Sequence, residues 1–280
     1  MSSPISTTRN GHVTWFKWHR GRRRLSDPVF TGKRILEAMA MGASIEVDLV
    51  VTGDKGFAVL HDTTLDRETT GQGSVAQTSD DVIRQLRLRD NDGAPITEPV
   101  MLLDDLCTLM ASGEVHPDAL LQLDYKEDEK VLDGRAIANF RRATLPVAKS
   151  IIVSSGSAAA VKLLTDAVPG MKIGYDPCHD DSLATLQRTG DFATFVADAL
   201  AASPNAEMIY LAWEIVIAAD TAGFDMIGAF HAGSRRVDCW TIKASDPASV
   251  ATVERLLALR TDQITTDDPE GLCAALGVPA

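Results

Sequence analysis

The chain has 280 residues, 45% of them hydrophobic and 24% charged, a composition typical of an ordered globular protein. Its formal net charge of −12 argues against nucleic acid as a partner, because phosphate binding depends on cationic surface. The sequence shows no signal-peptide pattern and no apolar run approaching the roughly 20 residues of a membrane span. We therefore expect a cytoplasmic protein without integral membrane segments, whose four scattered cysteines are reduced thiols.

Apolar segments of strand length alternate along the chain with longer amphipathic segments, which is typical of βα units and a parallel sheet. The predicted strands are Val13–Trp18, Ser44–Val50, Leu120–Tyr125, Ser150–Ser154, Lys172–Tyr175, Met208–Leu211, Arg236–Thr241 and Asp262–Thr265. The predicted helices are Gly32–Met41, Gly134–Arg142, Ser157–Ala167, Ser182–Ala202, Glu214–Phe224 and Pro247–Leu259. Such a series closes most economically into an α/β TIM (β/α)₈ barrel. An open doubly wound sheet is the alternative, but no GxGxxG or P-loop motif follows any strand.

The segment from residue 63 to residue 99 departs from this alternation. It is polar and charged, it contains glycine, and it has a short helix-like stretch at Asp80–Leu88. We expect a single barrel domain over residues 1–280, with this segment as a small insertion on the C-terminal rim.

The stretch SIEVDLVVTGDKGFAVLHD places two alternating apolar runs around a Gly-Asp-Lys-Gly turn at residues 53–56, which predicts a β-hairpin on the rim. With the two central turn residues as the loop, Asp48 lies opposite His61, and Glu46 shares their face. Two adjacent carboxylates are unfavourable unless a cation or protonation relieves them, so the natural counterpart is a hard divalent metal, Mg²⁺ or Ca²⁺. The pair could also face solvent on an amphipathic strand.

Two other predicted strands end in chemically active side chains. His19 and Arg20 follow the first strand, and Asp124 and Lys126 belong to the segment LDYK at the end of the third. In a TIM barrel the C-terminal ends of the strands surround one pocket, so these residues are expected to join the hairpin residues there. The set combines carboxylates for a cation, positive charges for a phosphate and histidines that can move protons near neutral pH.

The segments WHRG, SIEVDLVVTGDKGFAVLHD, TTLDRETTGQG and LDYK follow one another as the corresponding motifs do in glycerophosphodiester phosphodiesterases. Further along, IIVSS, DCWTIK and DQITTDDP resemble later motifs of that family. The resemblance implies a TIM barrel that hydrolyses a phosphodiester, a small molecule, to an alcohol and a phosphomonoester. The phosphomonoester is sn-glycerol 3-phosphate if the substrate is a glycerophosphodiester.

The resemblance also implies roles for particular residues. Glu46, Asp48 and Asp124 look like ligands of a divalent cation, His19 and His61 look like the catalytic pair, and Arg20 and Lys126 resemble the phosphate-contacting cations. Trp240 is a candidate wall of the alcohol subsite, as is Tyr175, because aromatic side chains at strand ends can provide an apolar or cation–π face. Ordinary barrel packing is the alternative for both aromatic residues.

The chain departs from the family pattern at three positions. Asp124 stands where the family usually has glutamate, Phe30 replaces an expected asparagine, and Lys243 replaces another. Together with the arginines at 22–24, these changes suggest a more anionic alcohol moiety. Two other functions remain open: a non-catalytic phosphate-binding barrel, and a phospholipase D-like lyase that forms a cyclic phosphate. The sequence does not indicate which alcohol is released or whether the chain oligomerises.

Overall fold

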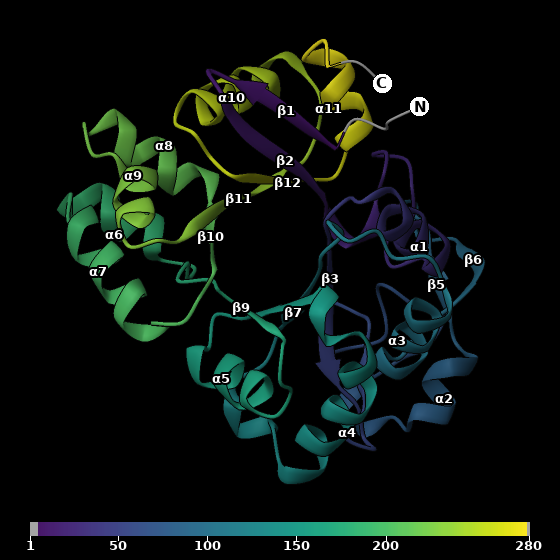
Figure 1. Cartoon of the computed structure of the whole chain (residues 1–280). Helices are drawn as coiled ribbons and strands as arrows, with labels where there is room; N and C mark the ends of the chain where they lie inside the picture. The colour runs from purple at the N-terminus through teal and green to yellow at the C-terminus, as the bar shows by residue number, and fades with distance from the viewer. Residues whose placement is uncertain (1–4, 279–280) are drawn as a thin grey trace.

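A parallel barrel forms the centre of the computed structural model, which describes residues 5–278. Its strands are β2 (His12–Trp18), β3 (Ile45–Val51), β7 (Leu121–Tyr125), β8 (Ile151–Ser154), β9 (Lys172–Tyr175), β10 (Met208–Ala212), β11 (Arg236–Ile242) and β12 (Gln263–Thr266). Each strand pairs in parallel with the next, and β2 pairs with both β12 and β3, which closes the ring (Figure 1). All the predicted strands are confirmed, each within one residue at either end.

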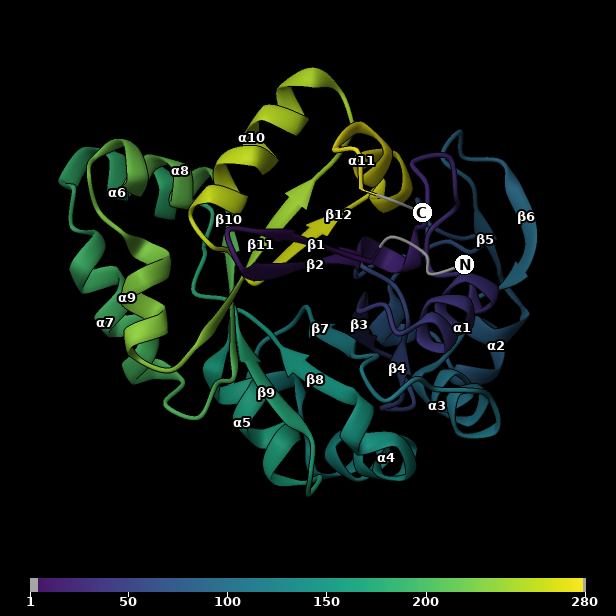
Figure 2. The ribbon, with the colours of Figure 1, turned by 45° about the horizontal axis from the view of Figure 1, so that its top comes forward.

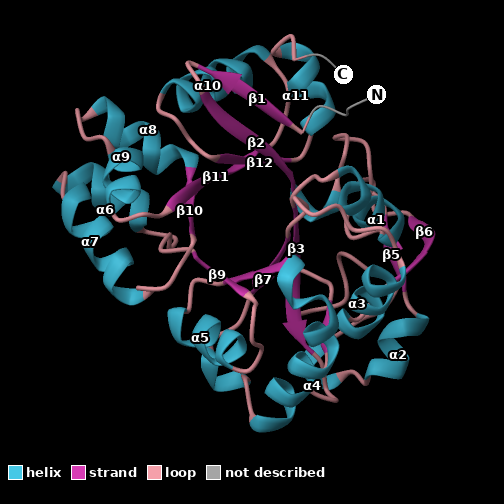
Figure 3. Cartoon of the chain, viewed as in Figure 1, coloured by secondary structure: helices cyan, strands magenta, loops and turns pink. Residues whose placement is uncertain are grey.

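Helices surround this ring, and Figure 3 shows them outside the strands. They are α1 (Gly32–Met41), α3 (Leu103–Ser112), α4 (Gly134–Thr144), α5 (Ala158–Asp166), α6 (Ser182–Thr189), α7 (Phe192–Ala202), α8 (Trp213–Thr221), α9 (Met226–Ala232), α10 (Pro247–Ala258) and α11 (Pro269–Ala275). The predicted helix Ser182–Ala202 is two helices, because Gly190 ends α6 with a φ of 68°. The sequence analysis did not predict α3, α9 or α11.

Two short strands pair antiparallel with the barrel. Strand β1 (Ser6–Arg9) pairs with β2, and β4 (Phe57–Ala58) pairs with β3. The hairpin between β3 and β4 exists, but its predicted register is wrong by one residue, since Thr52 donates to the carbonyl of Gly56 at 3.0 Å. The loop has three residues because Lys55 adopts a left-handed conformation with a φ of 64°. The ladder also ends at Ala58, so Asp48 does not lie opposite His61.

The segment 63–99 contributes α2 (Asp80–Gln85), a short 3₁₀ turn and the antiparallel pair β5 (Arg87–Arg89) and β6 (Pro95–Pro99). These elements lie outside the ring of strands (Figure 2). Asn91 accepts a hydrogen bond from Arg22 Nη2 at 2.7 Å and donates to the carbonyl of Leu25 at 3.1 Å. The segment is therefore fixed to the loop that follows the C-terminal end of β2. That one domain spans residues 1–280 stays a prediction.

The inner and outer faces of the strands differ in polarity. Because side chains alternate along a strand, Val47 and Leu49 of β3 face outward into the hydrophobic core under the helices. The alternate positions face the interior, where Lys17, Glu46 and Asp48 are charged yet only 2%, 5% and 1% exposed. Burying charge is costly unless it is paired, so this interior must be stabilised by partners or by a ligand.

Two further features bear on the sequence predictions. All four cysteines are free, and three of them are buried. Among residues 5–278, no single helix has both the length and the apolar character to cross a membrane; the pair α8 and α9 meets those criteria only jointly, with a bend of 104° between them.

Candidate active site

A cavity of about 250 Å³ opens at the C-terminal ends of the strands. Its lining includes seven of the eight predicted site residues: His19, Arg20, Glu46, His61, Asp124, Lys126 and Trp240. The eighth, Asp48, lies beneath Arg20 and Lys126, which contact its two oxygens. The structure therefore brings these eight residues together, even though the hairpin register used to connect Asp48 with His61 is wrong.

Three carboxylates converge within this site. Glu46 and Asp48 come from alternate positions of β3, and Asp124 is in register with Asp48 on the neighbouring strand β7. One oxygen of each lies within 4.8 Å of the others. Arg20 Nε and Lys126 Nζ lie 3.0 and 2.8 Å from the two oxygens of Asp48. The cluster offers only carboxylate oxygens, and two of its three members are buried, which fits a hard divalent cation such as Mg²⁺ or Ca²⁺.

The pKa values within this cluster diverge. Burial raises the pKa of Glu46 well above its usual value, and the neighbouring charge of Asp48 adds to the effect. Burial also acts to raise the pKa of Asp48, but the cations Lys126 and Arg20 outweigh it and hold that pKa below its usual value. Glu46 is thus the carboxyl with the greatest need of a further positive charge, which a bound cation would supply.

Arg20 contacts two of these carboxylates, one through its backbone N–H and one through its side chain. Arg20 is in the left-handed region, with φ 53° and ψ 29°, immediately after β2. Its N–H donates to Glu46 Oε2 at 3.0 Å, while its side chain reaches Asp48. The ring of Phe30 lies 5.8 Å from the Arg20 guanidinium carbon, and the Phe30 N–H donates to the Arg20 carbonyl. Phe30, which replaces an expected asparagine, therefore supports Arg20 by packing.

His19 is held in the site by a residue that the sequence analysis did not single out. Its Nδ1 lies 2.7 Å from Asp267 Oδ1, and its Nε2 lies 3.8 Å from Glu46 Oε2. Burial lowers the pKa of His19, and the hydrogen bond and charge of Asp267 oppose this only in part. With Nδ1 donating to Asp267, the neutral imidazole exposes the lone pair of Nε2 on the side of the carboxylates.

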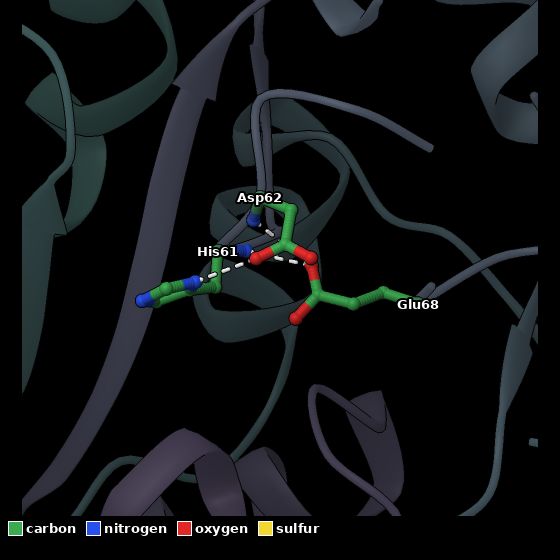
Figure 4. A group of neighbouring side chains, drawn as sticks. All are labelled: His61, Asp62 and Glu68. Atoms are coloured by element: carbon green, nitrogen blue, oxygen red, sulfur yellow. Dashed lines mark hydrogen bonds and ion pairs between the residues drawn. The ribbon is translucent and has the colours of Figure 1, made fainter. Parts of the chain in front are cut away.

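His61 also lines the cavity, and its side chain contacts an aspartate through Nδ1 as that of His19 does (Figure 4). Its Nδ1 lies 2.8 Å from Asp62 Oδ1, and the far ring nitrogen points away from both neighbouring carboxylates. Glu68 Oε2 accepts hydrogen bonds from the backbone N–H groups of His61 and Asp62, at 2.9 and 3.1 Å. Arg67 donates to both carboxylates. Because Arg67 already supplies positive charge there, we interpret this cluster as orienting His61, not as a second metal site.

Lys126 connects two of the acidic groups. Its Nζ lies 2.5 Å from Asp124 and 2.8 Å from Asp48. Burial acts to lower the pKa of Lys126, but these carboxylates outweigh it and raise that pKa, so the side chain is positively charged. Asp124 receives a second hydrogen bond, from Ser154 Oγ at 2.5 Å. The aspartate at this position is therefore fixed through both of its oxygens.

The cavity also contains residues that the sequence analysis missed. Asp176 directly follows β9, and burial, with a contribution from the charge of Asp124, raises its pKa to about 8. Lys17, Gln122 and Tyr210 line the floor of the cavity. The available signal for Asp176 and for Asp267 was their position in the sequence. Asp176 directly follows the predicted strand Lys172–Tyr175, and Asp267 lies two residues beyond the predicted strand Asp262–Thr265, at the end where a TIM barrel places its active site.

The remaining candidates divide between the cavity and the core. Trp240 and Lys243 line the cavity, whereas Tyr175 is buried in the hydrophobic core with a 7% exposed surface. The arginines at 22–24 are all ion-paired with carboxylates, to Asp267, Glu37 and Glu270. These ion pairs weaken the argument that the arginines attract a more anionic alcohol.

Residues 31–271 match the family model of the glycerophosphoryl diester phosphodiesterase family, so the match begins after His19 and Arg20. No curated protein matches the chain significantly in sequence.

Among solved structures, a chain from Agrobacterium tumefaciens str. C58, assigned provisionally as a glycerophosphoryl diester phosphodiesterase, superposes with a TM-score of 0.70 at 21% identity, covering 94% of this chain and 98% of that one. A phosphodiesterase from Oleispira antarctica in complex with the product sn-glycerol-3-phosphate gives a TM-score of 0.64 at 16% identity, covering 94% of this chain and 96% of that one. These likenesses show a shared fold. From the family match over most of its length, the chain belongs to the glycerophosphoryl diester phosphodiesterase family.

Proposed function

We propose that this phosphoric diester hydrolase cleaves a glycerophosphodiester to sn-glycerol 3-phosphate and an alcohol, with a divalent cation held by Glu46, Asp48 and Asp124. The observation that carries the proposal is the convergence of these three carboxylates, with one oxygen of each within 4.8 Å of the others, in a cavity that also holds two histidines. The product named for the Oleispira antarctica structure supports the choice of glycerol phosphate. Mg²⁺ and Ca²⁺ both suit the donor set, and the alcohol is not specified.

The proposed mechanism assigns proton transfer to the two histidines. When bound, the cation would polarise the phosphoryl oxygens and offset their charge. Arg20 and Lys126 would contact the same oxygens, since both already lie beside Asp48 at the base of the cavity. One of His19 and His61 would take a proton from the attacking oxygen at Nε2, and the other would protonate the leaving alkoxide. Asp267 and Asp62 would hold the two imidazoles in orientation through Nδ1.

Two alternatives belong to different classes of function. A binding barrel without turnover has no use for two histidines that line the same cavity and are each oriented by an aspartate. A lyase would use the same residues but would form a cyclic phosphate by attack of a substrate hydroxyl. Family membership favours the hydrolase. Trp240 and Lys243 would then form part of the alcohol subsite.

The experiment that tests this function is an assay of purified protein on a glycerophosphodiester such as glycerophosphoethanolamine, in Mg²⁺, in Ca²⁺ and in EDTA. We expect activity only with metal, loss of activity in His19→Ala and Glu46→Gln, and retention of activity in Glu37→Gln, whose carboxylate pairs with arginines outside the cavity. In isotopically labelled water, the hydrolase places solvent oxygen in the first product. A cyclic first product without solvent oxygen would identify the lyase, and inactivity on a panel of phosphodiesters with either metal would support the binding barrel.

A further inference from the structure

A chain of hydrogen bonds crosses the barrel interior and ends on Asp124. Lys17 Nζ, from β2, donates to Gln122 Oε1, on β7. Gln122 Nε2 donates to Ser154 Oγ on β8 at 2.8 Å, and Ser154 Oγ donates to Asp124 Oδ1 at 2.5 Å. The sheet register explains this order, because Asp124 is paired with Ser154 on adjacent strands.

The chemistry of the four groups fixes the direction of every hydrogen bond. A lysine ammonium can only donate, so the amide oxygen of Gln122 must face Lys17 and its NH₂ group must face Ser154. The Ser154 hydroxyl then accepts from Gln122, and its own proton points to Asp124. All the donors are thus directed toward one carboxylate oxygen of Asp124.

The far end of this chain is anchored in a buried ion pair. Lys17 Nζ lies 3.1 Å from Asp238 Oδ2, and the two side chains are 2% and 0% exposed. Asp238 also accepts a hydrogen bond from Thr265 Oγ1 at 2.7 Å, and Lys17 Nζ lies 4.3 Å from the centre of the Tyr210 ring. Lys17 is therefore held by Tyr210 on β10 and Asp238 on β11, and turning away from Gln122 would cost it the ion pair with Asp238.

We propose that Lys17, Gln122 and Ser154 are positioning residues that fix Asp124 as a ligand of the divalent cation. This inference rests on the metal site of the proposed function. Asp124 is 18% exposed in its side chain and, without Ser154, only Lys126 would restrain its carboxylate. Hydrogen bonds of this kind set the orientation of a metal ligand, and their loss typically weakens metal affinity by about 10–100-fold.

Metal titration of the full chain by isothermal titration calorimetry, without substrate, tests the proposal with Mn²⁺, Mg²⁺ or Ca²⁺ as the probe. Ser154→Ala removes the hydroxyl that contacts Asp124, and we expect it to weaken binding by about 10–100-fold. Gln122→Met keeps a side chain of similar length but leaves the Ser154 hydroxyl free to rotate, so its loss should be smaller. The matched control is Ser155→Ala: this neighbouring serine is 3% exposed, and its hydroxyl accepts from Ser157 N instead of contacting Asp124.

The thermal midpoint in EDTA separates positioning from general stability. We expect Ser154→Ala and Ser155→Ala to have similar midpoints in EDTA, while only Ser154→Ala loses part of the stabilisation that metal adds. If Ser154→Ala binds metal as tightly as wild type, or merely unfolds at lower temperature with unchanged affinity, the positioning role is overturned and the proposed metal site stands. If wild type binds none of the three cations, the metal site itself falls, and the positioning role falls with it.

Discussion

His19 Nδ1 lies 2.7 Å from Asp267 Oδ1, which joins the first and last strands of the barrel at their C-terminal ends. Asp267 also contacts Arg22 Nη1 at 3.1 Å, and it lies 7% exposed. The Asp267 carboxylate holds the His19 imidazole in one tautomer, because the carboxylate accepts a hydrogen bond and Nδ1 must therefore carry the proton.

Asp267→Asn is expected to lower kcat on the order of 10²-fold, the lower range for loss of an oriented acid or base, because an amide can present N–H to Nδ1 and stabilise the wrong tautomer. Steady-state kinetics on the phosphodiester identified by the assay above would measure it. Asp262→Asn is the matched control, since Asp262 forms a contact of 2.8 Å with His231 away from the cavity. Equal losses of kcat in the two variants would contradict the role of Asp267.

The buried pair Lys17–Asp238 gives a prediction for stability. Lys17→Met leaves Asp238 as an uncompensated buried charge, and we expect the free energy of unfolding to fall by about 3–5 kcal/mol. Adding Asp238→Asn should recover part of this loss, because it removes the charge left behind. Urea denaturation of wild type, Lys17→Met and the double variant measures both effects. A double variant no more stable than Lys17→Met would show that packing, not charge, dominates at this position.

Gly174 on β9 is expected to be intolerant of any side chain. A Cβ at this position would meet Tyr210 Cε2 at 2.5 Å and the carbonyl oxygen of Val153 at 3.3 Å, and the Tyr210 side chain is itself only 2% exposed. We expect Gly174→Ala to destabilise the chain by about 1–3 kcal/mol through overpacking. The control is Gly134→Ala at the start of α4, where a Cβ meets nothing within 4 Å. It should leave stability unchanged or raise it by ~0.4–1 kcal/mol, as thermal or urea unfolding would record.

The ion pairs around Glu37 predict a pH dependence of stability. Burial acts to raise the pKa of Glu37, but hydrogen bonds from Arg34 and Arg23 outweigh it and hold the pKa below its usual value of 4.5. The unfolded chain therefore binds a proton at higher pH than the folded chain. The stabilisation is present above pH 4.5 and is lost as the pH falls through the lower, folded pKa.

Glu37→Gln should consequently lose less stability than wild type between pH 6 and pH 3, as measured by urea unfolding at each pH. The difference should shrink at high salt, since the side chains are partly exposed and screening weakens their attraction. Parallel pH profiles for the two proteins would count against the pairing as a source of stability.

Local sequence pattern was enough to predict the barrel strands within one residue, because each has a run of apolar residues that must be buried on its outer face. The break in the helix predicted at Ser182–Ala202 was harder to see, since the residues on both sides of Gly190 remain good helix formers. The short helices α9 and α11 have too few turns to show a clear helical period of apolar residues in the sequence.

The sequence by itself determined the candidate chemistry: carboxylates, histidines and cations occur at the ends of predicted strands, and the motifs that contain them identified the family. Only the tertiary structure decided how they meet. The hairpin register depended on the left-handed conformation of Lys55, and the partners Asp267 and Ser154 lie 248 and 30 residues from His19 and Asp124. Such contacts depend on closure of the barrel and on the register between strands, which no local pattern specifies.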